Sequence, residues 1–123
     1  MGDYDRALTD HSKIIELNPQ KSESYLERAQ VYIVKKDYEK AVVDLSKAIE
    51  LDPKCIMAYS WRSYLYQEMN DYDQSWADVG KILELGGKVD ENFIKKLEEA
   101  SGRKDDSGTQ TPMKDSVVGD SGN

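Results

Sequence analysis

The residues of this 123-residue chain that are best suited to nucleophilic chemistry stand apart from one another. Cys55 is the only cysteine and His11 the only histidine, so the chain can form neither an internal disulfide nor a thiolate metal cage. A nucleophilic cysteine needs a nearby base and a third group that orients the base. Cys55 directly follows the Pro53-Lys54 pair, far from His11 in the sequence, and no third group is evident. We therefore expect Cys55 to be a small, partly buried apolar residue.

Paired carboxylates offer no better site. Glu98 and Glu99 are adjacent in the sequence. The side chains of adjacent helical residues point in directions about 100° apart, so these two cannot face one substrate. Asp71 and Asp73 resemble the first ligands of a calcium-binding loop. The sixth position of that loop requires glycine and is Trp76, and the twelfth requires glutamate and is Ile82. Phosphate loops, dinucleotide fingerprints and zinc spacings are also absent, so we expect no enzyme activity, no metal and no cofactor.

Composition and charge narrow the class of partner. The formal net charge is −7, with 38% hydrophobic and 33% charged residues. Nucleic-acid binding requires clustered lysine and arginine, which this chain lacks. The longest clearly apolar run is Val31 to Val34, whereas a membrane-spanning helix needs about 18 such residues. With no secretory pattern at the N-terminus, the sequence predicts a cytoplasmic protein that binds neither nucleic acid nor membranes.

One motif occurs three times with a strict spacing. GDYDRALTDHSKIIELNP at residues 2–19 returns as KDYEKAVVDLSKAIELDP at 36–53 and as NDYDQSWADVGKILELGG at 70–87. Over the last 17 positions the first two copies share 10 identities and the last two share 6. Unrelated segments of ordinary composition would share about one. The chain therefore contains a true internal repeat of 34 residues.

Each repeat contains two segments with the helical period. In the second copy, apolar residues recur at i, i+4 and i+7 on both sides of a Lys36-Asp37 turn, and Pro53 then ends the second segment. These residues are Tyr25, Ala29 and Tyr32, followed by Ala41, Leu45 and Ala48. The alanines allow the helix backbones to approach closely. The sequence thus predicts pairs of antiparallel helices.

The pattern resembles the tetratricopeptide repeat, a helix-turn-helix unit of 34 residues. The second copy matches its signature at Tyr25, Ala29, Tyr32, Tyr38, Ala41, Leu45, Ala48 and Pro53. The third copy keeps Tyr59, Tyr66 and Tyr72 but departs from it at Ser63, Ser75, Val79, Ile82 and Gly87. The resemblance implies an all-α fold, an α-solenoid of antiparallel helix pairs whose first helices line a concave groove.

The repeat also predicts the domain organisation. We expect a tetratricopeptide-repeat domain over residues 1–100, with a half repeat at 2–19 and full repeats at 20–53 and 54–87. A C-terminal capping helix is expected at 88–101, between an N-cap at Asp90 and a stop at Gly102. Residues 102–123 are rich in Ser, Gly and Asp and are predicted to be a disordered tail.

The half repeat lacks its first helix, which leaves one side of its remaining helix uncovered. We expect Tyr4, Leu8, His11 and Ile15 to lie on that side. Two interpretations remain open: the chain is a fragment of a longer repeat array, or it is a structural subunit that self-associates weakly through these residues.

The resemblance further implies which side chains face the groove. They are Glu23, Leu26, Glu27 and Gln30 in the first full repeat, and Met57, Ser60, Trp61, Tyr64 and Glu68 in the second. Co-chaperone repeats of this kind hold a C-terminal carboxylate with Lys, Asn and Arg, but this set contains no cation. We therefore expect a non-catalytic protein-protein interaction module, an adaptor or assembly factor, that binds a protein or short peptide with apolar and basic residues. Trp61 is either a binding anchor or a residue packed between neighbouring first helices.

Because the sequence contains no ligand set for metals or nucleotides, these compounds are expected to leave the fold unchanged. A ligand that binds only the native state raises its stability by mass action. The melting temperature should therefore stay constant in millimolar Ca²⁺, Zn²⁺ or ATP. An increase of several degrees with any of them would contradict the expectation.

Overall fold

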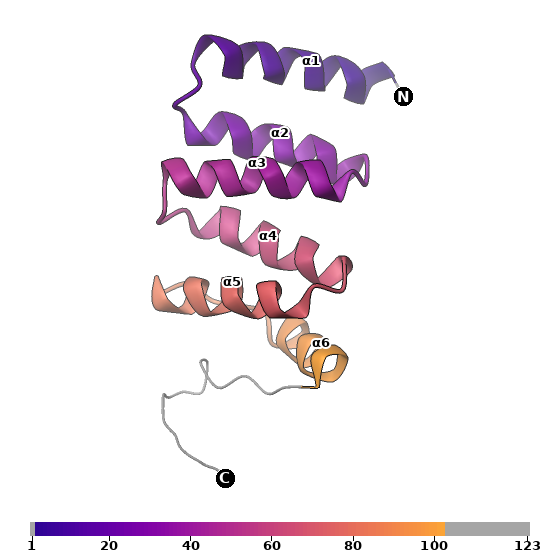
Figure 1. Cartoon of the computed structure of the whole chain (residues 1–123), viewed down its shortest axis with the longest axis vertical. Coiled ribbons are helices and arrows are strands. Elements are labelled where there is room, and N and C mark those ends of the chain that lie inside the picture. The colour runs from indigo at the N-terminus through magenta and orange to yellow at the C-terminus, as the bar shows by residue number, and fades with distance from the viewer. Residues whose placement is uncertain (1, 103–123) are drawn as a thin grey trace.

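Six helices make up the described part of the chain, residues 2–102 of the computed structural model, and this part contains no strand. The helices are α1 (Gly2–Leu17), α2 (Ser22–Val34), α3 (Tyr38–Leu51), α4 (Ile56–Glu68), α5 (Tyr72–Glu84) and α6 (Glu91–Ser101). Helices α1 to α5 follow one another as an antiparallel stack, and α6 lies at the end opposite α1 (Figure 1). The all-α repeat fold is therefore confirmed. The predicted tail lies outside the described residues, apart from Gly102.

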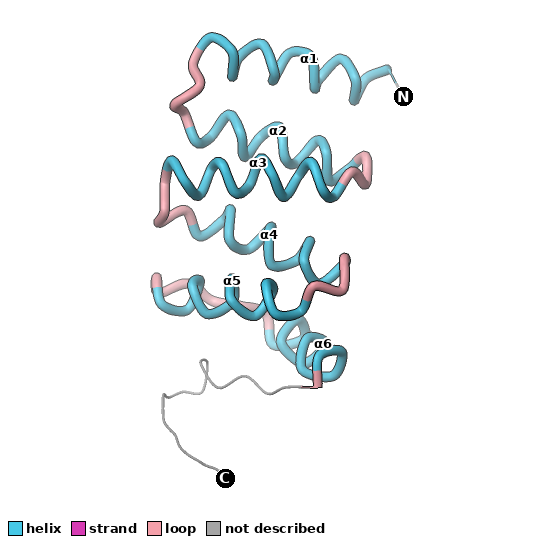
Figure 2. Tube along the Cα trace, in the orientation of Figure 1, coloured by secondary structure: helices cyan, strands magenta, loops and turns pink. Residues whose placement is uncertain are grey.

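Short loops connect the helices in a way that follows the repeat (Figure 2). The pair α2 and α3 falls within residues 20–53, and α4 and α5 fall within 54–87. The turn inside each pair contains one residue with positive φ, Lys36 at 65° and Asn70 at 63°. In both turns the next backbone amide donates to a carbonyl oxygen five residues earlier, at 2.8 Å. The two pairs thus use the same turn.

Small side chains bring the helices close together in the first core cluster. The buried members of this cluster are Ile15, Tyr25, Ala29, Ala41, Leu45, Ala48, Ala58 and Leu65. Ala29, Ala41 and Ala48 are completely buried, and they come from the two helices of one pair. Side chains this small let the backbones approach, so the neighbouring large residues can fill the remaining space at high density.

A hydrogen bond repeats where each full repeat begins. The Tyr25 hydroxyl donates to the carbonyl oxygen of Pro19 at 2.9 Å, and the Tyr59 hydroxyl donates to that of Pro53 at 3.0 Å. One period later the residue at the corresponding position is Phe93, which has no hydroxyl. This tie therefore cannot form at the start of α6.

Helix α6 crosses the stack at a steep angle to α4 and α5 (Figure 1). Leu97 occupies the position that Ala29 and Ser63 occupy in α2 and α4, and it is fully buried in a second cluster with Trp76 and Val79. A leucine cannot allow the close approach that alanine or serine allows. The larger side chain therefore explains why α6 does not continue the parallel arrangement of α2 and α4.

Gly87 occupies the position of Pro19 and Pro53, the last residues of the two earlier copies. Close packing around this position leaves no space for a side chain. A Cβ atom added there would lie 2.9 Å from Ile82 Cγ2 and 3.1 Å from Ile56 Cγ2. The chain therefore passes between two isoleucines just before it enters α6.

Two glycine substitutions should change stability in opposite directions. Gly87→Ala should lower the free energy of unfolding by about 1–3 kcal/mol because it overpacks a filled site. Gly80→Ala should raise it by about 1 kcal/mol, because this glycine lies inside α5 and nothing would touch the added methyl group. Urea melts measure both changes. Equal effects of the two substitutions would contradict the packing described for Gly87.

Candidate functional site

A buried ion pair holds three successive helices together. Arg28 on α2 donates from Nε and Nη2 to the carboxylate oxygens of Asp44 on α3, at 2.8 and 2.7 Å. Its Nη1 donates to Ser12 Oγ on α1 at 3.0 Å. The Asp44 side chain is only 4% exposed, so the guanidinium forms a two-pronged bond inside the protein. One arginine thus fixes α2 against the helices before and after it.

The same cluster recurs 34 residues later. Arg62 on α4 donates to Asp78 on α5 at 2.9 and 2.7 Å, and to Ser46 on α3 at 3.0 Å. We call each set of serine, arginine and aspartate a clamp. The clamps were not predicted from the sequence, although their serine, arginine and aspartate residues recur at the repeat spacing and could have indicated them.

The surroundings of the second clamp set its electrostatics. Arg62 Cζ lies 5.8 and 5.7 Å from the ring centroids of Tyr59 and Tyr66. Burial raises the pKa of the Asp78 carboxyl above its ordinary value, and the Arg62 guanidinium opposes this shift. The hydrogen bonds to Asp78 in turn raise the pKa of Arg62. Both groups are therefore stabilised as a pair, and neither is free for binding.

The residues predicted to face the groove occupy matching positions on α2 and α4, and we call them the groove row. The row pairs Glu23 with Met57, Leu26 with Ser60, Glu27 with Trp61 and Gln30 with Tyr64, and Glu68 follows one turn later. Met57 and Tyr64 are 54% and 38% exposed. Leu26 and Trp61 are half-buried and pack against the first core cluster, and Trp61 also meets Tyr64 edge to face. The exposed apolar surface of the row therefore belongs mainly to Met57 and Tyr64.

The charged members of the groove row are acidic and exposed. The Glu23 carboxylate lies 3.9 Å from Lys21 Nζ and its side chain is 74% exposed. The Glu27 carboxylate lies 3.9 Å from His11 Nδ1 and its side chain is 60% exposed. Each therefore keeps most of its contact with solvent. Glu68 is also exposed. Partial burial, with a smaller contribution from Glu68, raises the pKa of Tyr64. The Tyr64 hydroxyl therefore remains protonated and can donate a hydrogen bond.

A pocket of about 240 Å³ adjoins the row where α4 meets α6 and the loop before it. Its lining residues are Ser60, Ser63, Tyr64, Ile82, Lys88, Val89, Asp90 and Phe93. The groove prediction contained Ser60 and Tyr64 but none of the other six. Val89 and Phe93 carry an apolar pattern in the sequence, yet their meeting with Tyr64 depends on the angle of α6.

The structure changes the prediction for the N-terminal helix. Tyr4 is 42% exposed and His11 is half-buried, but Ile15 is only 9% exposed and belongs to the first core cluster. Leu8 and Ile15 share a side of α1 with Ser12, whose hydroxyl accepts a bond from Arg28 of α2. Ile15 is therefore covered, contrary to the prediction, whereas Leu8 is only half-buried.

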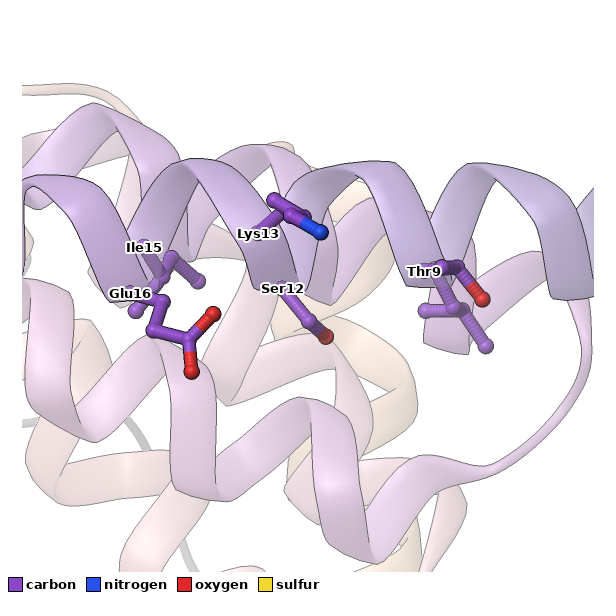
Figure 3. Close-up of a pocket in the computed structure, with 6 residues that line it drawn as sticks. Thr9, Ser12, Lys13, Ile15 and Glu16 are labelled. Atoms are coloured by element: carbon purple, nitrogen blue, oxygen red, sulfur yellow. The ribbon is translucent and has the colours of Figure 1, made fainter.

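A shallow hollow follows this same side of α1. Its lining residues are Leu8, Thr9, Ser12, Lys13, Ile15 and Glu16 (Figure 3). All six come from one helix, so no second element encloses the hollow. The hollow is therefore a depression beside α2 and not an enclosed binding site.

The described residues contain no assembled metal centre. Between residues 2 and 102, no group of three His, Cys, Asp or Glu side chains is placed to hold a metal ion. No helix in this range has the length and apolar character needed to cross a membrane. The candidate site is therefore the groove row with its adjoining pocket.

Residues 22–55 match the family model described as the tetratricopeptide repeat. The match covers α2 and α3 and the connection to α4. Over these residues the chain is similar to the tetratricopeptide repeat. No curated protein sequence matches it significantly.

Several solved tetratricopeptide-repeat domains share this fold. The first such domain of Spaghetti (RPAP3), bound to the HSP90 peptide SRMEEVD, is 25% identical with a TM-score of 0.76 and covers 82% of each chain. The first domain of human RPAP3 is 25% identical with a TM-score of 0.74, over 82% of this chain and 81% of that chain. The second domain of Spaghetti (RPAP3), also bound to SRMEEVD, is 25% identical with a TM-score of 0.64, over 68% and 78%. The chain thus has the fold of a protein-interaction module.

The clamps can be tested with an internal control. Asp44→Asn and Asp78→Asn should each lower the free energy of unfolding by about 3 kcal/mol, because each leaves a largely buried arginine without its counter-charge. Asp10 holds the equivalent position on α1 but is exposed, so Asp10→Asn should change stability by less than about 0.5 kcal/mol. Urea melts compare the three proteins. If all three substitutions lower the free energy of unfolding by the same small amount, the clamps do not hold the stack together.

Proposed function

We propose that this chain is a non-catalytic adaptor or assembly factor that binds a short segment of a partner protein along the groove row. The segment places one large apolar side chain in the pocket between α4 and α6. Its lysine or arginine residues lie against Glu23, Glu27 and Glu68. The observation that carries the proposal is the position of an apolar pocket at the end of an acidic, exposed row.

The pocket supports the apolar part of this proposal. At about 240 Å³ it is smaller than a typical site for a drug-sized ligand, but it can hold one leucine, methionine or phenylalanine side chain. Ile82, Val89 and Phe93 provide apolar walls, and Tyr64 provides a hydroxyl at the side. Interfaces often depend on a single anchor of this kind in a desolvated pocket.

The charges of the row support the basic part of the proposal. The nine row residues include three carboxylates and no lysine or arginine. Carboxylates at the rim attract basic segments and repel acidic ones. The neighbouring structures of Spaghetti (RPAP3) hold SRMEEVD, a peptide with an acidic end. The pocket lining contains one cation, Lys88, beside Asp90, and one lysine does not reproduce a cluster of donors for a carboxylate.

A display library of short peptides tests the proposal directly. We expect the retained peptides to combine Leu, Met or Phe with flanking Lys or Arg, and we expect synthetic SRMEEVD not to bind at micromolar concentration. Retention of acidic peptides, or tight binding of SRMEEVD, would contradict the proposed chemistry.

Variants of the row should reduce capture of a selected peptide without unfolding the protein. Tyr64→Ala should weaken binding at least tenfold, because it removes one wall of the pocket, whereas Val43→Ala on α3 should not. Tyr64 is preferable to Trp61 for this test, because truncation of a tryptophan packed on the core also lowers stability. Fluorescence anisotropy measures the affinities, and urea melts verify that both variants are folded.

The role of the carboxylates in the groove row can be tested with two double variants that change the net charge equally. Glu23→Lys with Glu27→Lys should weaken binding strongly at low ionic strength and less in high salt, because exposed charges are screened. Glu16→Lys with Glu39→Lys makes the same change in net charge on exposed residues of α1 and α3. Equal effects of the two double variants would mean that only net charge matters, and would contradict a basic segment seated on the row.

A further inference from the structure

Helix α6 lacks the residues that fix the equivalent helices α2 and α4 to their neighbours. Arg28 and Arg62 hold those two helices through the clamps. On α6 the position of the arginine is Lys96, which is exposed, and on α5 the position of the serine is Gly80, which has no hydroxyl. The tyrosine hydroxyl that ties the first turns of α2 and α4 is also missing, because α6 carries Phe93 there. α6 must therefore be attached to the stack in another way.

The attachment of α6 rests on a small apolar contact and on weak or single hydrogen bonds. Leu97 is the one buried residue among residues 91–101, whereas α2 buries three residues and α4 buries four. The Trp76 indole N–H donates to Ser101 Oγ at 3.0 Å. Gln67 Nε2 donates to the carbonyl oxygen of Phe93 at 3.5 Å, which is a weak hydrogen bond. Elements that bury little apolar surface open at a lower free energy than the whole fold.

The pocket lies across the connection that joins α6 to the stack. The chain leaves α5 at Gly86, with φ of 88°, and the Gly87 amide donates to the carbonyl oxygen of Ile82 at 2.9 Å, so α5 ends in a left-handed cap. Residues 88–90 then lead into α6. The lining residues before this connection are Ser60, Ser63, Tyr64 and Ile82, and those within or after it are Lys88, Val89, Asp90 and Phe93. Half of the pocket therefore belongs to α4 and α5, and the other half to α6 and its connection.

We propose that α6 is a lid on this pocket. In the open form Leu97 leaves the second core cluster while α2 to α5 remain folded. Phe93 lies one turn before Leu97 on the same side of α6, so it leaves the pocket in the same movement. In the closed form the apolar side chain of a bound segment packs against both Tyr64 and Phe93. The closing step rests on the function proposed for the groove row, whereas the opening of α6 in the free chain does not.

The bound side chain favours the closed form because only that form supplies both sides of the pocket. A ligand shifts an equilibrium between two forms only by its difference in affinity for them. In the open form a large apolar side chain would lose its contacts with Val89 and Phe93. A ligand that binds only the closed form, at a hundred times its Kd, lowers the open population about a hundredfold. A segment with alanine at the anchor position reaches less of the α6 wall and should close the lid less.

Native-state hydrogen exchange of the full chain in low concentrations of urea tests the opening. The amides of α6 should exchange through an opening that is at least tenfold more populated than global unfolding. Their exchange should also depend less on urea than that of α3, because the opening of one helix exposes less surface than unfolding. Exchange of the α6 amides only through the opening that α3 uses would overturn the proposal.

A pair of serine variants tests whether the far end of α6 holds the lid. Ser101→Ala removes the acceptor of the Trp76 indole N–H, so α6 should exchange roughly two- to tenfold faster, as expected for the loss of one hydrogen bond. Ser22→Ala makes the same change at the start of α2 and should leave the exchange of α6 as it is. Equal exchange of α6 in the two variants would contradict a separately held lid.

A peptide retained by the display library, with one leucine flanked by lysines, tests the closing step. At a hundred times its Kd it should slow the exchange of α6 about a hundredfold and leave the frayed first turn of α1 unchanged. The same peptide with alanine in place of leucine, at equal occupancy, should slow α6 much less. Equal slowing by the two peptides, or equal slowing of α1 and α6, would overturn the closing step. If the library retains no peptide, the function proposed for the groove row fails together with the closing step, and the exchange of the free chain still decides whether α6 opens.

Discussion

The buried pair of arginine and aspartate is the interaction on which the stack depends. Taking both charges out of water is costly, and the cost is recovered only when the geometry is good and the remaining hydrogen bonds are made. Here each guanidinium meets its carboxylate through two bonds and reaches the preceding helix through a serine. A rotation of either helix of the ion pair would leave a buried charge without its partner, and a rotation of the preceding helix would break the hydrogen bond to the serine. The clamps therefore fix how each helix is turned, in addition to holding it in place.

That rotation determines which surfaces remain for binding. With Arg28 and Arg62 turned into the clamps, the groove row lies on the same side of both α2 and α4. The repetition stops at α6, where Lys96 replaces the arginine and Gly80 on α5 replaces the serine. Without a clamp, and with Leu97 in place of a small residue, α6 crosses at a different angle and closes the pocket against Tyr64. The candidate site thus arises where the repeat ends.

The sequence predicts the 34-residue period and the helix pairs well, because the same residue type recurs at equivalent positions of the repeats. Tyr4, Tyr38 and Tyr72 give the spacing, and Pro53 marks the end of a pair. The pocket could not be predicted, since it depends on the angle of α6. The position of Ile15 was also missed, because a helix in this stack has two buried sides and periodicity alone does not separate them.

A double-mutant cycle between Arg62 and Asp78 tests most directly whether the clamps hold the stack. Arg62→Met, Asp78→Asn and the double variant would be compared with the wild-type protein by urea unfolding. Because the charges are close and largely buried, we predict that the two changes are strongly non-additive, with a coupling energy of at least about 1.5 kcal/mol. Additive effects, with a coupling energy within about 0.3 kcal/mol of zero, would contradict the account.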